Sequence, residues 1–114
     1  MVQVVPILRV ADVDAALAWW RQLGFRHDFT HRYGGDTTYR FMGIRREGAD
    51  VFLSENAADA SGPGLVFVWV PDVDRLAEGL GVRVEQHPWA RDFEVTDPDG
   101  NRVRVGTKEV GQSA

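Results

Sequence analysis

The sequence contains no cysteine and no long hydrophobic run. Without thiols the chain can form no disulfide, no zinc-thiolate site and no cysteine nucleophile, which is typical of a cytoplasmic protein. The longest apolar run, residues 65–70, has the length of a strand and falls far short of the ~20 residues that span a bilayer. Residues 1–6 show neither the basic segment nor the cleavage site of a secretory signal. We therefore expect a cytoplasmic protein with no membrane partner.

The chain also lacks an excess of positive charge. The chain carries 13 lysines and arginines against 17 aspartates and glutamates, a net charge of −4. Nucleic-acid-binding proteins usually carry a basic excess, so we expect no nucleic-acid partner. A weakly acidic protein is better suited to neutral or cationic small molecules. A Gly-x-Ser-x-Gly elbow and a phosphate-binding loop are both missing, so nucleophilic catalysis has no candidate residues.

The sequence instead shows an internal repeat. The phrase Val-Ala-Asp-Val-Asp at 10–14 recurs as Val-Pro-Asp-Val-Asp at 70–74, and each copy follows an apolar run, at 4–10 and 65–70. A helix-like stretch then leads to Leu-Gly in both copies, at Gly24 and Gly81. Chance could produce so short a phrase, but the matching context favours duplication of one supersecondary unit.

The aspartates of the repeat stand where helix N-caps belong. A carboxylate at Asp12 or Asp72 can accept a free backbone N–H at the start of the following helix. Val13, Ala16, Leu17 and Trp20 then follow at the three- and four-residue spacing of a core-facing stripe. We interpret these aspartates as caps rather than as a catalytic acid–base pair.

The remaining segments read as strands separated by glycine-rich turns. The prediction is a single α+β domain, 1–114, of two βαβββ modules that form curved sheets with helices on the outer side. The modules span about 1–56 and 64–108, joined by a linker at 57–63. Expected strands, besides the two apolar runs, are residues 25–30, 37–43, 51–55, 83–87, 91–96 and 102–107.

This order resembles the vicinal oxygen chelate superfamily, which includes glyoxalase I, extradiol dioxygenases and the fosfomycin and bleomycin resistance proteins. The resemblance rests on Asp12 followed by Ala18-Trp19-Trp20 and Leu23-Gly24-Phe25, and on Asp-Pro-Asp-Gly-Asn at 97–101. Residues 5–8, 68–70 and 87–93 are similar to bleomycin resistance proteins in particular. That resemblance implies a homodimer with two ligand grooves at the subunit interface, often with exchanged N-terminal strands.

Enzymes of this superfamily bind a divalent metal through His, Glu or Gln at four symmetric strand positions. Alignment of the motifs places these positions at Val5, Leu53, Leu65 and Arg104. Aliphatic and guanidinium side chains cannot coordinate a metal ion. We therefore expect no metal site and no cofactor, and we interpret the three histidines (His27, His31 and His87) as loop or edge residues.

Strand alternation suggests what the former metal cleft contains. If Leu65 faces the cleft, so do Phe67 and Trp69, and if Leu53 faces it, so does Glu55. Arg104 is expected to face inward with Glu94 as its partner. Core packing is the alternative for Phe67 and Trp69, and a solvated surface charge is the alternative for Glu55. The predicted ligand-binding residues are Phe29, Glu55, Phe67, Trp69 and Trp89.

The sequence thus favours a metal-free binding protein that confers antibiotic resistance by sequestering bleomycin-type glycopeptides in an aromatic groove. Aromatic faces would enclose a planar part of the drug, and acidic residues would attract its cationic tail. One alternative is a metal-dependent lyase or dioxygenase of the same superfamily. Another is a binding module for a different planar metabolite.

Overall fold

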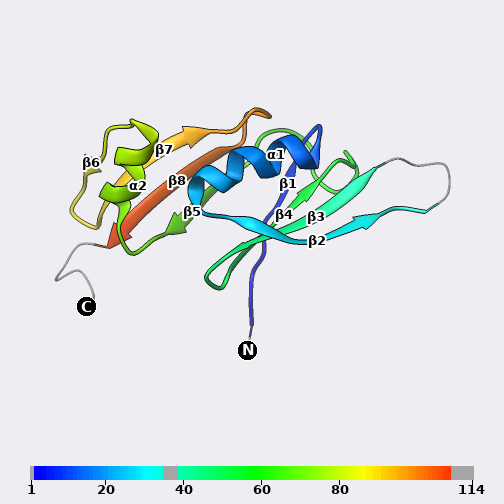
Figure 1. Cartoon of the computed structure of the whole chain (residues 1–114), viewed down its shortest axis with the longest axis horizontal. Helices are drawn as coiled ribbons and strands as arrows, with labels where there is room; N and C mark the ends of the chain where they lie inside the picture. Colours follow the sequence, from blue (N-terminus) through cyan, green and yellow to red (C-terminus); the bar gives the residue numbers. More distant parts are fainter. Residues whose placement is uncertain (1, 35–38, 109–114) are drawn as a thin grey trace. The chain divides into compact units, whose positions relative to one another are not determined.

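The computed structural model describes residues 2–34 and 39–108, and it contains two copies of one arrangement of strands and a helix (Figure 1). The first copy consists of β1 (Ile7–Arg9), α1 (Val13–Trp20) with a short 3₁₀ turn η1 (Arg21–Leu23), β2 (Arg26–Arg32), β3 (Arg40–Arg46) and β4 (Ala49–Ser54). The second consists of β5 (Leu65–Trp69), α2 (Val73–Leu80), β6 (Glu85–Gln86), β7 (Ala90–Thr96) and β8 (Arg102–Lys108).

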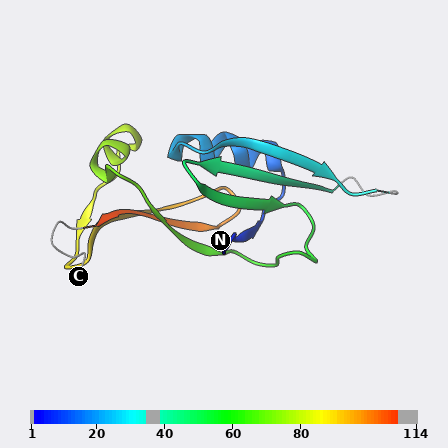
Figure 2. The ribbon, with the colours of Figure 1, turned by 90° about the horizontal axis from the view of Figure 1, so that it is seen from below.

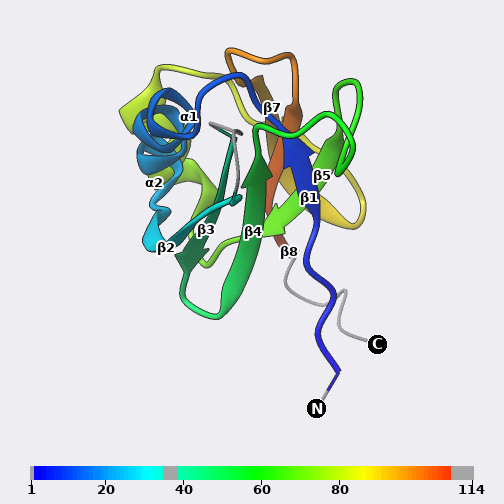
Figure 3. The same cartoon turned by 90° about the vertical axis from the view of Figure 1, so that its right-hand side faces the viewer.

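Each module forms its own four-stranded mixed sheet. The strand orders are β1-β4-β3-β2 and β5-β8-β7-β6, so the first strand of each module lies beside its last strand and runs parallel to it (Figures 1 and 3). The other neighbours are antiparallel. The α+β class and the pair of βαβββ modules are thus confirmed. Contacts divide the chain into two compact units, Met1–Gly64 with Asp97–Asn101 and Leu65–Thr96 with Arg102–Ala114.

Helix α1 covers one face of the first sheet (Figure 2). It begins where Asp12 accepts hydrogen bonds from the N–H groups of Asp14, at 2.8 Å, and Ala15, at 3.3 Å. Its predicted apolar stripe is buried, and α1 contacts β2, β3 and β4. Both the cap and the stripe are confirmed.

Helix α2 also begins at an aspartate cap. Asp72 accepts a hydrogen bond from the N–H of Arg75 at 3.1 Å, and Gly81 ends the helix with a left-handed φ of 69°. A side chain from the end of each module also binds the first helical N–H. Glu55 Oε2 accepts from Val13 at 3.0 Å, and Thr107 Oγ1 accepts from Val73 at 2.9 Å.

Several strand boundaries differ from the expected ones. The turn between β3 and β4 is tighter than expected, because Glu47 and Gly48 both adopt positive φ, and β4 therefore starts at Ala49. Strand β6 is limited to Glu85–Gln86, and β1 to three residues. The expected strand positions 37 and 38 lie outside the described residues. No helix among the described residues is long and apolar enough to cross a membrane.

Asn101 joins three separate segments within the first unit. Its amide nitrogen donates to the carbonyl of Arg9 and to Asp97 Oδ2, both at 3.0 Å, and its Oδ1 accepts from the N–H of Gly64 at 2.8 Å. The side chain is completely buried. No hydrophobic residue could satisfy these backbone groups, so the asparagine is a structural requirement of this turn.

We predict that Asn101→Ala lowers the free energy of unfolding by roughly 1–3 kcal/mol, since backbone groups of Arg9 and Gly64 lose their side-chain partner. Urea unfolding followed by far-UV circular dichroism measures this. Asn56→Ala is the control, because Asn56 makes a hydrogen bond at the surface, to the N–H of Ala58. Equal losses in the two variants would contradict the structural role of Asn101.

Candidate functional site

The open face of the first sheet, away from α1, carries an aromatic cluster. Phe52 lies between Val51 and Leu53 in β4, and both neighbours are buried, so Phe52 points to the opposite face. Its ring lies 5.6 Å from that of Phe29 and 5.2 Å from that of Phe41. Phe29 and Phe41 are stacked at 6.3 Å. The predicted residue Phe29 is therefore part of a three-ring surface of the first unit.

The expectation that Leu53 faces the cleft is wrong. Leu53 is completely buried on the helix side of the sheet. Phe52 lies opposite Ile7 in the first module, and Arg104 lies opposite Phe67 in the second. Phe52, and not Leu53, is therefore the counterpart of Arg104. Phenylalanine has no metal-binding atom, so the corrected position still supplies no ligand at the place that the superfamily's enzymes use.

Glu55 is buried rather than directed to the open face. Its carboxylate accepts hydrogen bonds from the backbone N–H of Val13 and from both the backbone and the guanidinium of Arg40. Hydrogen bonds to Asp14 and Glu55 in turn raise the pKa of Arg40. These contacts occupy the carboxylate within the fold, and they leave it little capacity to meet a ligand's cation.

The open face of the second sheet presents a row of large apolar side chains along β5. Leu65, Phe67 and Trp69 are 50%, 40% and 50% exposed, whereas the alternating residue Val68 is buried. The rings of Phe67 and Trp69 lie 4.6 Å apart, and Lys108 Nζ lies 5.4 Å from the centre of the Trp69 ring. The structure thus brings together two of the predicted ligand-binding residues.

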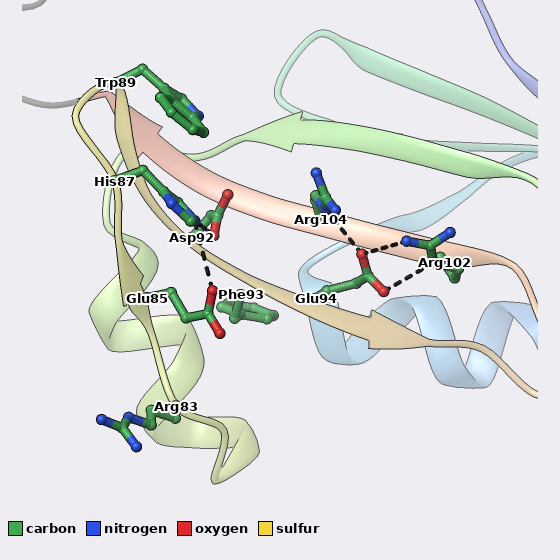
Figure 4. Close-up of a pocket in the computed structure, with 9 residues that line it drawn as sticks. All are labelled: Arg83, Glu85, His87, Trp89, Asp92, Phe93, Glu94, Arg102 and Arg104. Atoms are coloured by element: carbon green, nitrogen blue, oxygen red, sulfur yellow. Dashed lines mark hydrogen bonds and ion pairs between the residues drawn. The ribbon is translucent and has the colours of Figure 1, made fainter.

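A pocket of about 440 Å³ lies in the same unit, between β6, β7 and β8 (Figure 4). Its lining residues are mostly charged: Arg83, Glu85, His87, Trp89, Asp92, Phe93, Glu94, Arg102 and Arg104. Glu94 binds Arg104 at 3.0 Å, as expected, and also binds Arg102 at 3.0 Å. The hydrogen bonds from Arg102 and Arg104 hold the pKa of the Glu94 carboxyl below its usual value.

Trp89 stands at the rim of this pocket and is 56% exposed. Its ring stacks on the imidazole of His87 at 4.8 Å, with only 6° between the two planes. His87 Nε2 lies 3.0 Å from Asp92 Oδ1 and 3.8 Å from Glu85 Oε2 (Figure 4). The structure therefore places Trp89 beside a cluster of three possible metal ligands.

Glu85, His87 and Asp92 are not among the predicted site residues. His87 was interpreted as a loop or edge residue, and Glu85 and Asp92 were given no role. One signal was present, because the expected strand 83–87 would place Glu85 and His87 on one face. Asp92 joins them through the pairing of β6 with β7, in which Glu85 lies opposite Asp92.

Comparisons with known proteins agree with this architecture. A family model described as "Glyoxalase superfamily protein" matches residues 1–112. The chain belongs to the glyoxalase superfamily. A search of curated proteins found no match.

Solved structures similar to this glyoxalase-superfamily chain include binding proteins and an enzyme. A bleomycin-binding protein in complex with bleomycin has a TM-score of 0.71 at 20% identity, over 96% of this chain and 100% of that one. TnmS3, an antibiotic-binding protein from Streptomyces sp. CB03234, has a TM-score of 0.72 at 23% identity, over 96% and 98%. Lactoylglutathione lyase from Agrobacterium tumefaciens has a TM-score of 0.65 at 22% identity, over 96% of both chains. These likenesses establish the shared fold.

The position of Phe29 on the open face depends on Gly43. The two residues face each other across β2 and β3, and a methyl group at Gly43 would lie 2.6 Å from Phe29 Cδ1. We predict that Gly43→Ala displaces the Phe29 ring and lowers the free energy of unfolding by about 1–3 kcal/mol.

A double-mutant cycle with Phe29→Ala, measured by urea unfolding, tests the cause. Gly43→Ala should cost at least about 1 kcal/mol less when Phe29 is already alanine, because the two residues are in direct contact. An unchanged cost in that background would show that another contact restricts position 43.

Proposed function

We propose that this protein binds a small-molecule antibiotic of the bleomycin class, as a homodimer, without transforming it. The exposure of Phe67, Trp69 and Trp89 in one unit carries the proposal. Large aromatic side chains on a soluble protein are seldom left in water unless a ligand or partner covers them. Flat aromatic rings are also the side chains that best enclose a planar organic group.

Charge supports a cationic ligand. The net charge of −4 attracts a cation at long range and favours its encounter with the protein. Because Glu55 is engaged with Arg40 and Val13, we assign this attraction to the acidic surface as a whole. The aromatic contacts would then supply most of the affinity, since stacking is not screened by salt.

Two of the similar structures fit this proposal. They are a bleomycin-binding protein in complex with bleomycin and an antibiotic-binding protein. The four symmetric positions that hold the metal in the superfamily's enzymes carry no ligand side chain in this sequence. The residues therefore support binding of a drug better than a metal-dependent reaction at these four positions.

A metal-dependent lyase or dioxygenase is the second candidate. The observation in its favour is the convergence of Glu85, His87 and Asp92 beside the pocket. The two candidates differ in their need for metal, because a lyase or dioxygenase reaction would require the ion and drug binding would not. Protein that has been stripped with chelator and then freed of the chelator should retain full drug affinity if the first proposal holds.

The homodimer follows from the uncovered sheet faces. Each module has one helix, which covers one face of its sheet and leaves Phe29, Phe52, Phe67 and Trp69 on the open side. We predict a stable dimer at micromolar concentration, measured by sedimentation equilibrium. A monomer across that range would contradict the assembly and leave the proposed groove incomplete.

The ligand itself is tested by titration with bleomycin while tryptophan emission is recorded. We expect quenching with micromolar or tighter affinity, because Trp69 and Trp89 are assigned to the groove. Trp89→Ala should weaken binding by about 1–3 kcal/mol, the scale of a lost aromatic anchor. Trp19→Phe, on helix α1, is the matched control and should bind as the parent does.

Glu55→Gln should also bind nearly as tightly as the parent, because its carboxylate is occupied within the fold. If bleomycin leaves both emission and thermal melting unchanged at a large molar excess, the proposal fails. If bleomycin binds but Trp89→Ala binds it as tightly as the parent does, the drug lies elsewhere. The exposed row of β5 that includes Phe67 is then the next surface to test.

A further inference from the structure

The hairpin of β6 and β7 gathers three metal-binding side chains at one point. Glu85 and Asp92 are cross-strand partners, so their side chains leave the sheet on the same face. His87, two residues after Glu85, turns its Nε2 toward both carboxylates (Figure 4). One ligand atom from each residue lies within 4.8 Å of the other two.

The cluster contains a nearly buried carboxylate. Asp92 is only 7% exposed, and a buried carboxylate needs a positive partner or strong hydrogen bonds. Within the described part of the chain, the hydrogen bond to its side chain comes from His87. The nearby arginines Arg102 and Arg104 bind Glu94 instead. The cluster thus combines two carboxylates and one imidazole, a set of side chains that binds divalent ions.

The imidazole is also held in the required orientation. Trp89 stacks flat on the His87 ring and so fixes the plane in which Nε2 points at the carboxylates. Metal-binding histidines are usually oriented by a hydrogen bond from the other ring nitrogen, whereas here the stacked indole restricts the ring plane. Glu85, whose side chain is 73% exposed, has the freedom to close the remaining distance. With metal–ligand bonds of about 2.0–2.2 Å, tetrahedral ligand atoms lie about 3.3–3.6 Å apart. The His87–Asp92 pair at 3.0 Å therefore has to open slightly, and Glu85 at 3.8 Å from the imidazole has to move closer.

We propose that Glu85, His87 and Asp92 bind a first-row divalent transition metal ion of the Zn²⁺ type. One imidazole and two carboxylates suit this class, whereas Mg²⁺ and Ca²⁺ prefer oxygen ligands alone. The site is distinct from the four symmetric strand positions of the superfamily's enzymes, since it lies on β6, β7 and the turn between them. It also does not depend on the proposed drug binding.

Three protein ligands leave coordination positions for another molecule. These positions border the pocket, whose lining includes Arg83, Arg102 and Arg104. A molecule in the pocket could therefore reach the ion through an anionic oxygen, such as that of a carboxylate.

Isothermal titration of the full chain with ZnCl₂ tests the site. We expect one ion per chain, with affinity reduced at least tenfold in His87→Ala and in Asp92→Asn. Two control variants should bind as the parent does. They are His27→Ala, which removes a histidine bonded to Thr30 in β2, and Glu94→Gln, which removes an acidic pocket residue outside the cluster. MgCl₂ at the same concentration should give no signal.

Trp89 provides a second, optical readout. Ni²⁺ should quench tryptophan emission saturably, because the Trp89 ring lies against the imidazole that binds the ion. Trp89→Phe should abolish most of this quenching while it retains Ni²⁺ binding by calorimetry. Circular dichroism confirms that each variant is folded before it is compared.

Three results would overturn the site: no saturable Zn²⁺ binding, unchanged affinity in folded His87→Ala and Asp92→Asn, or equal binding of Mg²⁺. Bleomycin titration of the chelator-stripped protein keeps this test separate from the proposed function. If the protein binds bleomycin but no metal ion, only the metal site is rejected. If it binds the metal ion but not bleomycin, only the proposed drug binding is rejected.

Discussion

One helix covers one face of each four-stranded sheet, and the rest of the structure depends on this constraint. Strand side chains alternate between faces, so the residues that build the core also determine which residues remain open. In β4, Val51 and Leu53 pack on the helix side and thereby direct Phe52 outward. In β5, Val68 does the same for Phe67 and Trp69. The aromatic surfaces are thus a direct consequence of how the core is made.

Local signals explain why so much of the fold could be predicted. Aspartate caps and left-handed glycines act within a few residues, so Asp12, Asp72 and Gly81 could be assigned from the repeat alone. Strand register was harder, because Phe52 and Leu53 are both apolar and alternation could not distinguish them. The burial of Val51 and Leu53 decides the matter, because it leaves Phe52 on the opposite face of β4.

The candidate sites show the same limit. Trp69 could be placed on the open face because the alternation of side chains within one strand can be deduced from that strand's sequence alone. The cluster of Glu85, His87 and Asp92 requires knowledge of which β7 residue lies opposite β6, and that pairing is set by the length of the turn between them. Glu55 was misread for a related reason: its partners, Arg40 and Val13, come from other elements.

The fold alone does not select a function, since similar structures include drug-binding proteins and a lyase. The side chains of the second sheet carry two different chemistries at opposite edges. The order β5-β8-β7-β6 places the aromatic row of β5 at one edge and the carboxylate–imidazole cluster of β6 and β7 at the other, with β8 beside β5. Arg104 on β8 pairs with Phe67 on one side and with Glu94 on the other, so the charged strand separates the apolar surface from the polar pocket. Stacking of a planar ligand and coordination of an ion therefore use separate residues, and only Trp89, which stacks on His87, belongs to both.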